Sequence, residues 1–408
     1  MDIYEVGGCV RDRLLGREQT DRDWVVVGAS AEEMEQLGYR RVGKDFPVYL
    51  HPETHEEYAL ARTERKSGRG YYGFSIDASA TITLEEDLSR RDLTINAMAL
   101  AADGTLIDPY GGRADLESRI LRHVSPAFVE DPLRVLRVAR FAARFDFTVA
   151  EETNALMREI ANSGELTSLA PERIWSELNR ALNESYPARF LRTLRDCGAL
   201  AQLFPELDRL FGVPQPPKYH PEIDTGEHIC LALQRAAAVG ANPIVRFAVL
   251  VHDLGKGTTE TELLPSHKGH EERGVALVED FCRRFRVPKA HRGVALAVTA
   301  YHLKVHRARE LRPTTLLRLL YELDALRRPE RLDDILCACA IDATGRGGDF
   351  GHAAYPAADY IRQARDVIAR VETSDLRERE TDGEALRAAL DNRRVDALRE
   401  FRLHDHAG

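Results

Sequence analysis

The pattern of apolar residues changes near residue 125, and this change predicts two kinds of architecture in series. Before that point, short apolar runs of strand length alternate with glycine-containing turns, as at 23–27, 46–50 and 57–61. After it, apolar residues recur at helical spacing, with prolines near first helical turns, at 131–145, 151–162, 171–183 and 188–194. The sequence therefore predicts an α+β chain, with a small mixed-sheet head followed by helical regions.

A proline cluster at 212–221 (GVPQPPKYHP) is the clearest candidate linker, because it cannot sustain a helix or a central strand. Beyond it lies a second helical block that is rich in histidine and aspartate. The expected regions are a head at 1–125, a helical neck at 126–211, a linker at 212–227, the His-Asp block at 228–329 and a helical tail at 330–408.

The net charge of −9 argues against nonspecific coating of nucleic acid, although a local cluster of basic residues can still bind it. The six cysteines include no CxxC pair, so neither a zinc ribbon nor a disulfide framework is indicated. The N-terminus lacks the features of a signal peptide, and no apolar run approaches the ~20 residues of a membrane span. We therefore expect a soluble, reduced, cytoplasmic protein with no membrane contact and no obligate protein partner.

Glycines and acids near the N-terminus predict a site for a metal ion and a triphosphate. Asp21 and Asp23 lie two apart at the edge of an apolar strand, so their carboxylates face the same side. Two such charges repel unless a cation lies between them, and Mg²⁺ prefers oxygen ligands and phosphates. Gly7 and Gly8 let backbone N–H groups approach a triphosphate, and Arg11 adds charged hydrogen bonds.

These residues resemble the active site of nucleotidyltransferases related to poly(A) polymerases and DNA polymerase beta. Three further segments narrow the resemblance to the bacterial class II CCA-adding enzymes: RRDLTINA at 90–97, DPYGG at 108–112 and EDPLR at 130–134. The likeness extends along nearly the whole chain. It implies a polymerase-beta-like head, template-independent addition and repair of the 3′-terminal CCA of tRNA, and CTP, ATP and Mg²⁺ as ligands.

The resemblance also implies roles for individual residues of the head. In such enzymes, two metal ions held by the paired acids act on the tRNA 3′-hydroxyl and on the departing pyrophosphate. Phosphoryl transfer depends on positioning and charge stabilisation, so Gly8, Arg11 and Arg91 are expected at the triphosphate. Glu57 is the candidate for a third carboxylate.

Without a template, the protein itself must choose the base. Asp131 and Arg134 lie one turn apart on the predicted helix, which makes their side chains neighbours. Cytosine and adenine both present an amine donor beside a ring-nitrogen acceptor, which Asp131 and Arg134 can match. Uracil and guanine present the opposite pattern, and each mismatched contact costs about 1–3 kcal/mol. Arg137 and Arg140 wind away on the same helix toward other parts of the nucleotide or the tRNA, whereas Arg144 fits a solvated basic face equally well.

The segment 62–72 (RTERKSGRGYY) is rich in arginine, lysine, tyrosine and glycine. A flexible basic flap that orders when substrate arrives and a plain surface loop both fit this composition. With the helix arginines, it gives the local positive charge that the net charge does not show.

The His-Asp block resembles the HD-domain metal phosphohydrolases, through the order His228, His252-Asp253, Asp342. A mixed set of imidazole and carboxylate ligands suits a transition metal, with Ni²⁺ among the candidates, better than Mg²⁺. The triplet His267, His270 and His302 is a candidate lining for a second metal position. The resemblance implies hydrolysis of phosphomonoesters and 2′,3′-cyclic phosphates, that is, phosphatase, 2′-nucleotidase and 2′,3′-cyclic phosphodiesterase activities.

Three other functions compete with that of a CCA-adding enzyme. A poly(A) polymerase shares the head, but the His-Asp block disfavours it. A protein-modifying uridylyltransferase would need UTP, which the Asp131/Arg134 pair should reject. A noncatalytic RNA-binding scaffold gains nothing from acids that face phosphate.

Overall fold

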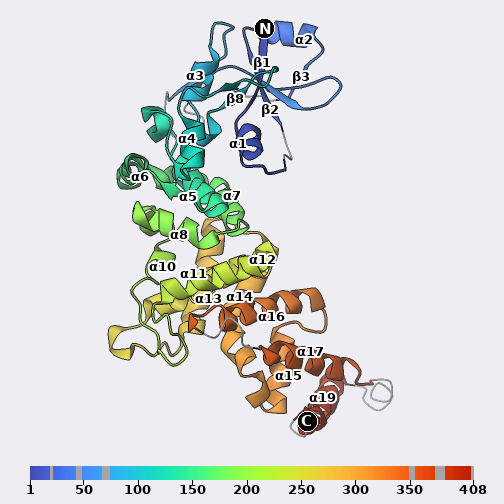
Figure 1. Cartoon of the computed structure of the whole chain (residues 1–408). Coiled ribbons are helices and arrows are strands. Elements are labelled where there is room, and N and C mark those ends of the chain that lie inside the picture. The colour runs from blue at the N-terminus through green and yellow to red at the C-terminus, as the bar shows by residue number, and fades with distance from the viewer. Residues whose placement is uncertain (19–21, 43–47, 67–73, 349–353, 373–381, 406–408) are drawn as a thin grey trace. The chain divides into compact units, whose positions relative to one another are not determined.

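The computed structural model describes residues 1–18, 22–42, 48–66, 74–348, 354–372 and 382–405 (Figure 1). The chain forms two compact units. The first comprises Met1–Ala181 and Arg189–Leu203, and the second comprises Leu182–Ala188 and Phe204–Gly408. In the part of the chain that is described, no helix is both long and apolar enough to cross a membrane.

A mixed sheet forms the head of the first unit, and its described strands follow the order β3-β4-β5-β2-β1-β8-β9. β2 pairs antiparallel with β1 and parallel with β5. Val25 and Val26 of β2 belong to two different apolar clusters, so this central strand packs against both layers of the head. The strands are β1 (Asp2–Val6), β2 (Asp23–Val27), β3 (Arg40–Arg41), β4 (Val48–Leu50), β5 (Glu57–Leu60), β8 (Ala99–Leu100) and β9 (Leu106–Ile107).

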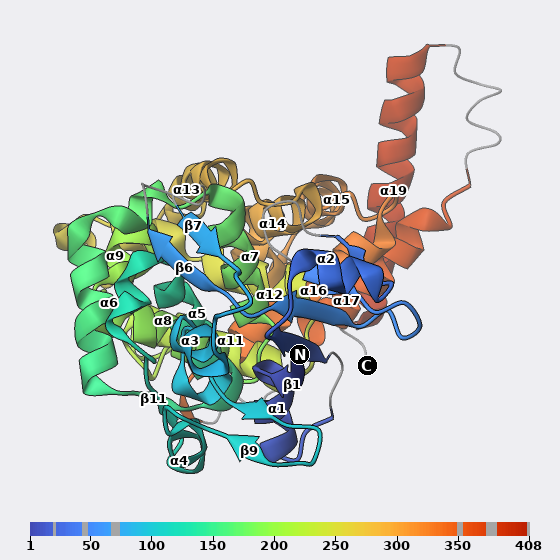
Figure 2. The same cartoon turned by 90° about the horizontal axis from the view of Figure 1, so that it is seen from above.

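Two smaller strand pairs accompany the sheet. The antiparallel pair β6 (Thr63–Lys66) and β7 (Phe74–Asp77) forms a ribbon apart from the main sheet (Figure 2). The parallel pair is β10 (Ile120–Leu121) with β11 (Thr148–Val149).

The helical elements that begin in the first unit include close matches to the helices expected at 151–162 and 171–183, and a match to the one expected at 131–145 that begins only at Leu133. They are α1 (Gly8–Leu14), α2 (Ala31–Gln36), α3 (Leu84–Ser89), η1 (Thr94–Asn96), α4 (Gly112–Glu117), η2 (Pro126–Glu130), α5 (Leu133–Phe145), α6 (Glu151–Ser163), η3 (Glu165–Ser168), α7 (Pro171–Leu182) and α9 (Ala199–Leu203), together with α8 (Pro187–Asp196), which begins at the end of the short 182–188 segment. The predicted mixed-sheet head followed by helices is confirmed.

The second unit is helical in its described residues. Its elements are α10 (Pro205–Asp208), α11 (Thr225–Ala238), α12 (Pro243–Val251), η4 (Leu254–Thr258), η5 (Thr261–Leu263), α13 (His270–Arg284), α14 (Lys289–His306), η6 (Ala308–Glu310), α15 (Pro313–Glu322), α16 (Pro329–Thr344), α17 (Pro356–Ala369) and α19 (Gly383–Asp405). α12 begins with the Asn242 cap followed by Pro243 and is apolar over most of its length. It packs against α11, α14 and α16, so it forms the centre of this unit and delivers His252 to the interior.

The proline-rich segment 212–221 is packed into the second unit, although its composition is typical of a linker. Gln215 is 1% exposed and His220 is 8% exposed. Pro214 forms an isolated antiparallel bridge with Asp224. The prolines exclude helix and central strand, as expected, but they do not prevent the segment from burying Gln215 and His220.

Candidate functional site

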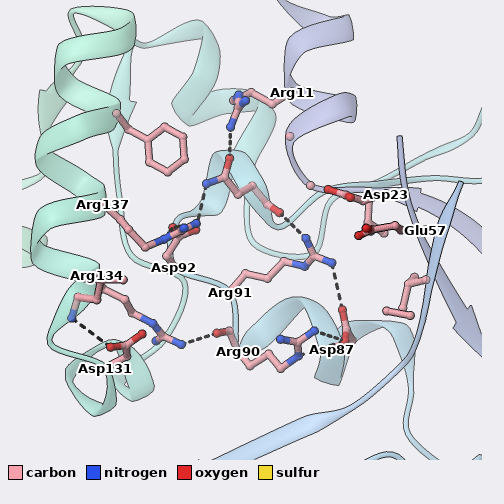
Figure 3. Close-up of a pocket in the computed structure, with 18 of the residues that line it drawn as sticks. Arg11, Asp23, Glu57, Asp87, Arg90, Arg91, Asp92, Asp131, Arg134 and Arg137 are labelled. Carbon is pink, nitrogen blue, oxygen red and sulfur yellow. Dashed lines mark hydrogen bonds and ion pairs between the residues drawn. The ribbon is translucent and has the colours of Figure 1, made fainter. Parts of the chain in front are cut away.

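A cavity of about 580 Å³ opens in the first unit, a size that is typical of a small-molecule site (Figure 3). Arg11 from α1, Asp23 from β2 and Glu57 from β5 line it. Further lining comes from the segment between α3 and η1 and from the start of α5: Arg90, Arg91, Asp92, Asp131, Arg134 and Arg137.

Two carboxylates stand side by side at one end of this cavity. Asp23 begins β2 and is paired in parallel register with Glu57 of β5. Both side chains are exposed, and Figure 3 shows them next to each other. Asp21 lies outside the described residues. Because two carboxylates this close repel each other, their position fits a divalent cation with oxygen ligands.

Gly7 is required by its backbone conformation, and it lies close to an arginine. Its φ of 77° is a conformation that side chains disfavour, and a Cβ there would lie 2.7 Å from Nη1 of Arg91. Arg91 also donates to Asp87 at 3.3 Å and to the backbone oxygen of Asn96 at 3.4 Å. The glycine turn therefore leaves room for the guanidinium beside the carboxylate end of the cavity.

A hydrogen-bonded network links helices α1 and α5 through the RRDLTINA segment. Arg11 is 3% exposed and donates to Asp12 and to the side chain of Asn96. Asn96 donates to Asp92 at 3.0 Å, and Asp92 accepts from Arg137 at 2.7 Å. Burial alone would raise the pKa of Asp92, but Arg137 and Asn96 outweigh it and lower the pKa to about 2. These positive side chains are thus held in place before any ligand binds.

The expectation that Asp131 and Arg134 share one helix is wrong. Asp131 is extended, with φ −116° and ψ 104°, and α5 begins only at Leu133. Pro132 explains this, because the residue before a proline is disfavoured in helical geometry. Both side chains nevertheless line the cavity, at the end away from Asp23 and Glu57 (Figure 3).

The guanidinium of Arg134 is anchored by backbone. It donates to the carbonyl oxygen of Ala127 at 2.9 Å and to that of Arg90 at 2.6 Å. Asp131 accepts from the backbone N–H of Leu133 at 3.1 Å and lies 3.4 Å from Nη2 of Arg173. Both groups therefore have fixed positions in the cavity wall.

The remaining arginines of α5 do not form a solvated basic face. Arg140 is 7% exposed, lines the cavity and pairs with Glu177 of α7 at 2.7 Å. Arg144 also lines the cavity and lies 3.0 Å from Asp12. Of the basic segment 62–72, residues 67–73 lie outside the described residues, while Arg62 lines the cavity.

The second unit gathers the four predicted metal ligands His228, His252, Asp253 and Asp342, each of which is at most 3% exposed. Nε2 of His228 lies 3.1 Å from Oδ1 of Asp342. Nε2 of His252 lies 3.2 Å from Oδ2 of Asp253 and 3.7 Å from Oδ1 of Asp342. Burial alone would lower the pKa of His252, but the two carboxylates outweigh it and raise the pKa to about 10.

These ligand atoms fit a metal ion. Nε2 of His252 and both carboxylate oxygens of Asp253 are buried without a well-formed hydrogen bond among the described residues. Nζ of Lys256 does lie 2.7 Å from Oδ2 of Asp253, as an ion pair. Buried polar atoms left in this way are costly, and nitrogen and oxygen ligands at such spacing suit a transition metal.

Side chains around the cluster fix its ligands. Nδ1 of His228 lies 2.9 Å from Oε1 of Glu222, which leaves Nε2 for a metal. Oδ2 of Asp342 lies 2.7 Å from Nε2 of His306, whose Nδ1 lies 2.7 Å from the Tyr355 hydroxyl. Sequence analysis missed Glu222, His306 and Tyr355 because no local motif marks them.

The proposed trio for a second metal position is only partly gathered. His270 and His302 lie together, with their Nε2 atoms 3.3 Å apart. Both ring nitrogens of His267 are bonded elsewhere. Nδ1 lies 2.8 Å from the Thr259 hydroxyl, and Nε2 donates to the Pro214 carbonyl at 3.0 Å, so neither nitrogen is available to a metal ion. Including His267 in this trio was therefore wrong.

Comparison with known families covers most of the chain. Residues 3–122 match the family described as Poly A polymerase head domain, and residues 225–328 match the HD domain family. Residues 146–211 match a family described as a probable RNA and SrmB-binding site of polymerase A.

Similar proteins match over nearly the full length. A multifunctional CCA protein of Thioalkalivibrio sulfidiphilus is 59% identical over 405 residues, which cover 98% of this chain and 99% of that protein. The Bacillus stearothermophilus CCA-adding enzyme in complex with CTP is similar in structure, with a TM-score of 0.65, 24% identity, and coverage of 98% of this chain and 89% of that one. The Thermotoga maritima CCA-adding enzyme complexed with tRNA gives a TM-score of 0.63 at 20% identity, over 99% and 91%.

Replacing Asp92 tests the network at the centre of the cavity. A carboxylate whose pKa is lowered by folding stabilises the protein above its unfolded pKa of ~3.9, and this contribution is lost as the pH falls toward the folded value. We expect Asp92→Asn to lower the free energy of unfolding by roughly 2–3 kcal/mol at pH 7, with about half of that difference gone by pH 3. Urea unfolding followed by circular dichroism at several pH values measures it, with Glu85→Gln, an exposed carboxylate of α3, as the control. A difference that stays constant from pH 7 to pH 3 contradicts the assignment.

Proposed function

Because this chain belongs to the family of multifunctional CCA proteins, tRNA nucleotidyltransferases that carry an HD domain, we propose a two-part activity for it. The first unit adds and repairs the 3′-terminal CCA of tRNA from CTP and ATP without a template. The second unit hydrolyses phosphate esters at its histidine-aspartate cluster. We further propose that the protein works in the cytoplasm, where its tRNA and nucleotide substrates are found. We propose that residues 1–125, 126–211, 228–329 and 330–408 serve as head, neck, HD region and tail, with the packed segment 212–227 belonging to the HD region rather than acting as a linker.

The observation that carries the first activity is the arrangement of the cavity. Asp23 and Glu57 stand at one end, Asp131 and Arg134 at the other, and Arg11 and other arginines lie in its wall. Mg²⁺ held by the acids, with Asp21 as a further proposed ligand, would activate the attacking hydroxyl and neutralise the leaving pyrophosphate. The glycine turn at Gly7-Gly8 and the guanidinium groups of Arg11, Arg91, Arg137 and Arg140 would hold the nucleotide in line for attack.

We propose that the base is selected by Asp131 and Arg134, at the end of the cavity away from Asp23 and Glu57. An ionised Asp131 only accepts hydrogen bonds, so it can take one from the exocyclic amine of cytosine or adenine. Arg134 has five N–H donors, so it can donate to the ring nitrogen as well as to the backbone carbonyls that anchor it. Because the backbone holds this guanidinium in place, it cannot turn to suit a uracil or guanine edge. The pair therefore favours C and A over U and G.

The carboxylate pair is tested by Asp23→Ala. We expect incorporation of labelled CTP into tRNA lacking its 3′ end to fall about a thousandfold, because the metal contributes several kcal/mol to the transition state. Binding of tRNA, measured by gel shift, should change little. Glu85→Ala, which removes an exposed carboxylate of the same unit, should leave both unchanged. Incorporation that survives Asp23→Ala would refute the metal assignment.

Base selection is tested by Asp131→Ala, with each labelled nucleotide supplied in turn. We expect the preference for CTP over UTP to fall about 10- to 100-fold, since one base contact of about 1–3 kcal/mol is lost. A uniform loss of activity with all four nucleotides, at unchanged preference, would show that Asp131 does not inspect the base.

The buried cluster of the second unit supports the proposed hydrolysis. A transition metal bound there, with Ni²⁺ as one candidate, would supply a nucleophilic water and polarise the phosphate. A cavity of about 1180 Å³ lies beside the cluster and is lined by the basic groups of Lys256, Lys268, Lys304, Arg307 and Arg346. Such a lining suits an anionic substrate, and we propose phosphatase, 2′-nucleotidase and 2′,3′-cyclic phosphodiesterase activities toward RNA ends.

The second activity is tested by His252→Ala. We expect metal-dependent hydrolysis of a 2′,3′-cyclic phosphate to be abolished while CCA addition by the same preparation stays close to normal, because the two sites lie in separate units. CCA addition is thus the internal control for folding. Loss of both activities together would assign His252 a structural role instead.

A further inference from the structure

One aromatic ring is exposed at the large cavity of the second unit. Tyr219 lines this cavity and is 54% exposed, more than any other aromatic residue that the structure describes. Nζ of Lys218 lies 5.3 Å from the centre of its ring, so a positive charge accompanies it. Tyr186, the next most exposed at 39%, does not line the cavity. Aromatic side chains usually contribute through burial, so a ring left in water at a cavity calls for an explanation.

The exposure of this ring is not due to a loose segment. The backbone N–H of Tyr219 donates to the carbonyl of Pro216 at 3.0 Å, and its own carbonyl accepts from Nη1 of Arg346 at 3.2 Å. The next residue, His220, is buried and its Nδ1 lies 3.0 Å from Oε1 of Glu222. The tyrosine is therefore carried by a turn that is fixed on both sides, and its ring is held at the cavity wall before any ligand binds.

The same turn is tied to the histidine-aspartate cluster. Nη2 of Arg346 lies 3.5 Å from Oδ1 of Asp342, while Nη1 of the same guanidinium holds the carbonyl of Tyr219. Oε1 of Glu222, just beyond the turn, lies 2.9 Å from Nδ1 of His228. A single guanidinium thus separates the tyrosine backbone from a carboxylate of the cluster. A molecule whose phosphate reaches the cluster has the rest of its structure close to this ring.

The lining of the cavity suits more than a phosphate group. Lys304 and Arg307 supply positive charge, whereas Leu303 and Leu311 supply apolar surface next to Tyr219. The volume of about 1180 Å³ exceeds the ~300–1,000 Å³ that is typical of sites for drug-sized molecules. A phosphate alone would leave most of this space to water. Charge combined with a flat apolar platform is the combination that binds single-stranded nucleic acid, through its backbone and its stacked bases.

We propose that Tyr219 stacks on the base of the nucleotide whose phosphate is hydrolysed at the cluster. The ring makes the second unit selective for nucleotide ends over simple phosphate esters. Because every base has a π-face, this selectivity depends on the presence of a base rather than on its identity. The inference rests on the proposed phosphohydrolase function of this unit and deepens it, by naming the residue that determines the substrate class.

A pair of substrates that differ only in the base tests the proposal. Full-length protein supplied with Ni²⁺ is assayed with adenosine 2′,3′-cyclic phosphate and with the 2′,3′-cyclic phosphate of 1-O-methylribose, which has no base. We expect Tyr219→Ala to raise KM for the adenosine substrate about 5- to 100-fold, through loss of one stacking contact. Its kcat should stay within about twofold, because the ring touches the base and not the reacting phosphate. Hydrolysis of the base-free substrate should not change.

Two variants serve as controls. Tyr219→Phe keeps the ring and should keep the preference for the adenosine substrate, whereas Tyr186→Ala removes an exposed tyrosine of the same unit away from the cavity and should change neither substrate. Equal kcat/KM of the parent protein for both substrates would overturn the stacking platform alone. A preference that survives Tyr219→Ala would overturn the assignment to this residue. No hydrolysis of either substrate by the parent would overturn the proposed phosphohydrolase function, so the failures are distinguishable.

A second measurement does not depend on activity. Metal-free protein is irradiated with 8-azidoadenosine 2′-monophosphate, and the labelled peptides are identified by mass spectrometry. We expect label on the peptide that contains Tyr219, and its loss in Tyr219→Ala. Label confined to peptides of the first unit would contradict the proposal.

Discussion

The bond between Asp92 and Arg137 lies at the centre of the charged network in the wall of the first unit's cavity, which we propose binds the nucleotide. Through Asn96, the same carboxylate is connected to Arg11 on a different helix, so one buried acid aligns positive charges from α1 and α5. Removing such charges from water is costly, and the cost is offset only because each partner is hydrogen-bonded with good geometry. The result is a set of cations already fixed in the cavity between Asp23 and Glu57 at one end and Asp131 and Arg134 at the other. If this cavity binds a triphosphate as we propose, little reorganisation is needed, which is what charge stabilisation in phosphoryl transfer requires.

This network also explains how an acidic protein can offer a basic site. The net charge is −9, yet the cavity wall contains Arg11, Arg91 and Arg134. Several acids in or behind the wall are paired with the arginines, as Asp12 is with Arg11 and Asp87 with Arg91. The carboxylates thus hold the guanidinium groups in position. For this reason the net charge of the whole chain says little about the electrostatic potential inside one cavity.

Local patterns predicted the parts of the site that depend on short sequence distances. The strand that starts at Asp23 and the helix that ends at Phe145 both followed from periodicity. The position of Asp131 was misjudged although Pro132 gave a local reason to end the helix after it. Glu57 lies beside Asp23 only because β2 and β5 pair in parallel. The contact between His306 and Asp342 likewise joins two separate helices. Such contacts join residues far apart in the chain, so no spacing rule could identify them.

The buried proline-rich stretch limits how the two halves could be exchanged between proteins. Gln215 receives a hydrogen bond from Lys256, and Glu222, just beyond the prolines, orients His228. A recombination point placed within that stretch, where composition alone suggests a linker, would separate the histidine-aspartate cluster from side chains that support it. A self-sufficient module has to begin further upstream, near Phe204, where the second compact unit resumes. A segment without helix or strand is therefore not necessarily a domain boundary at which recombination is tolerated.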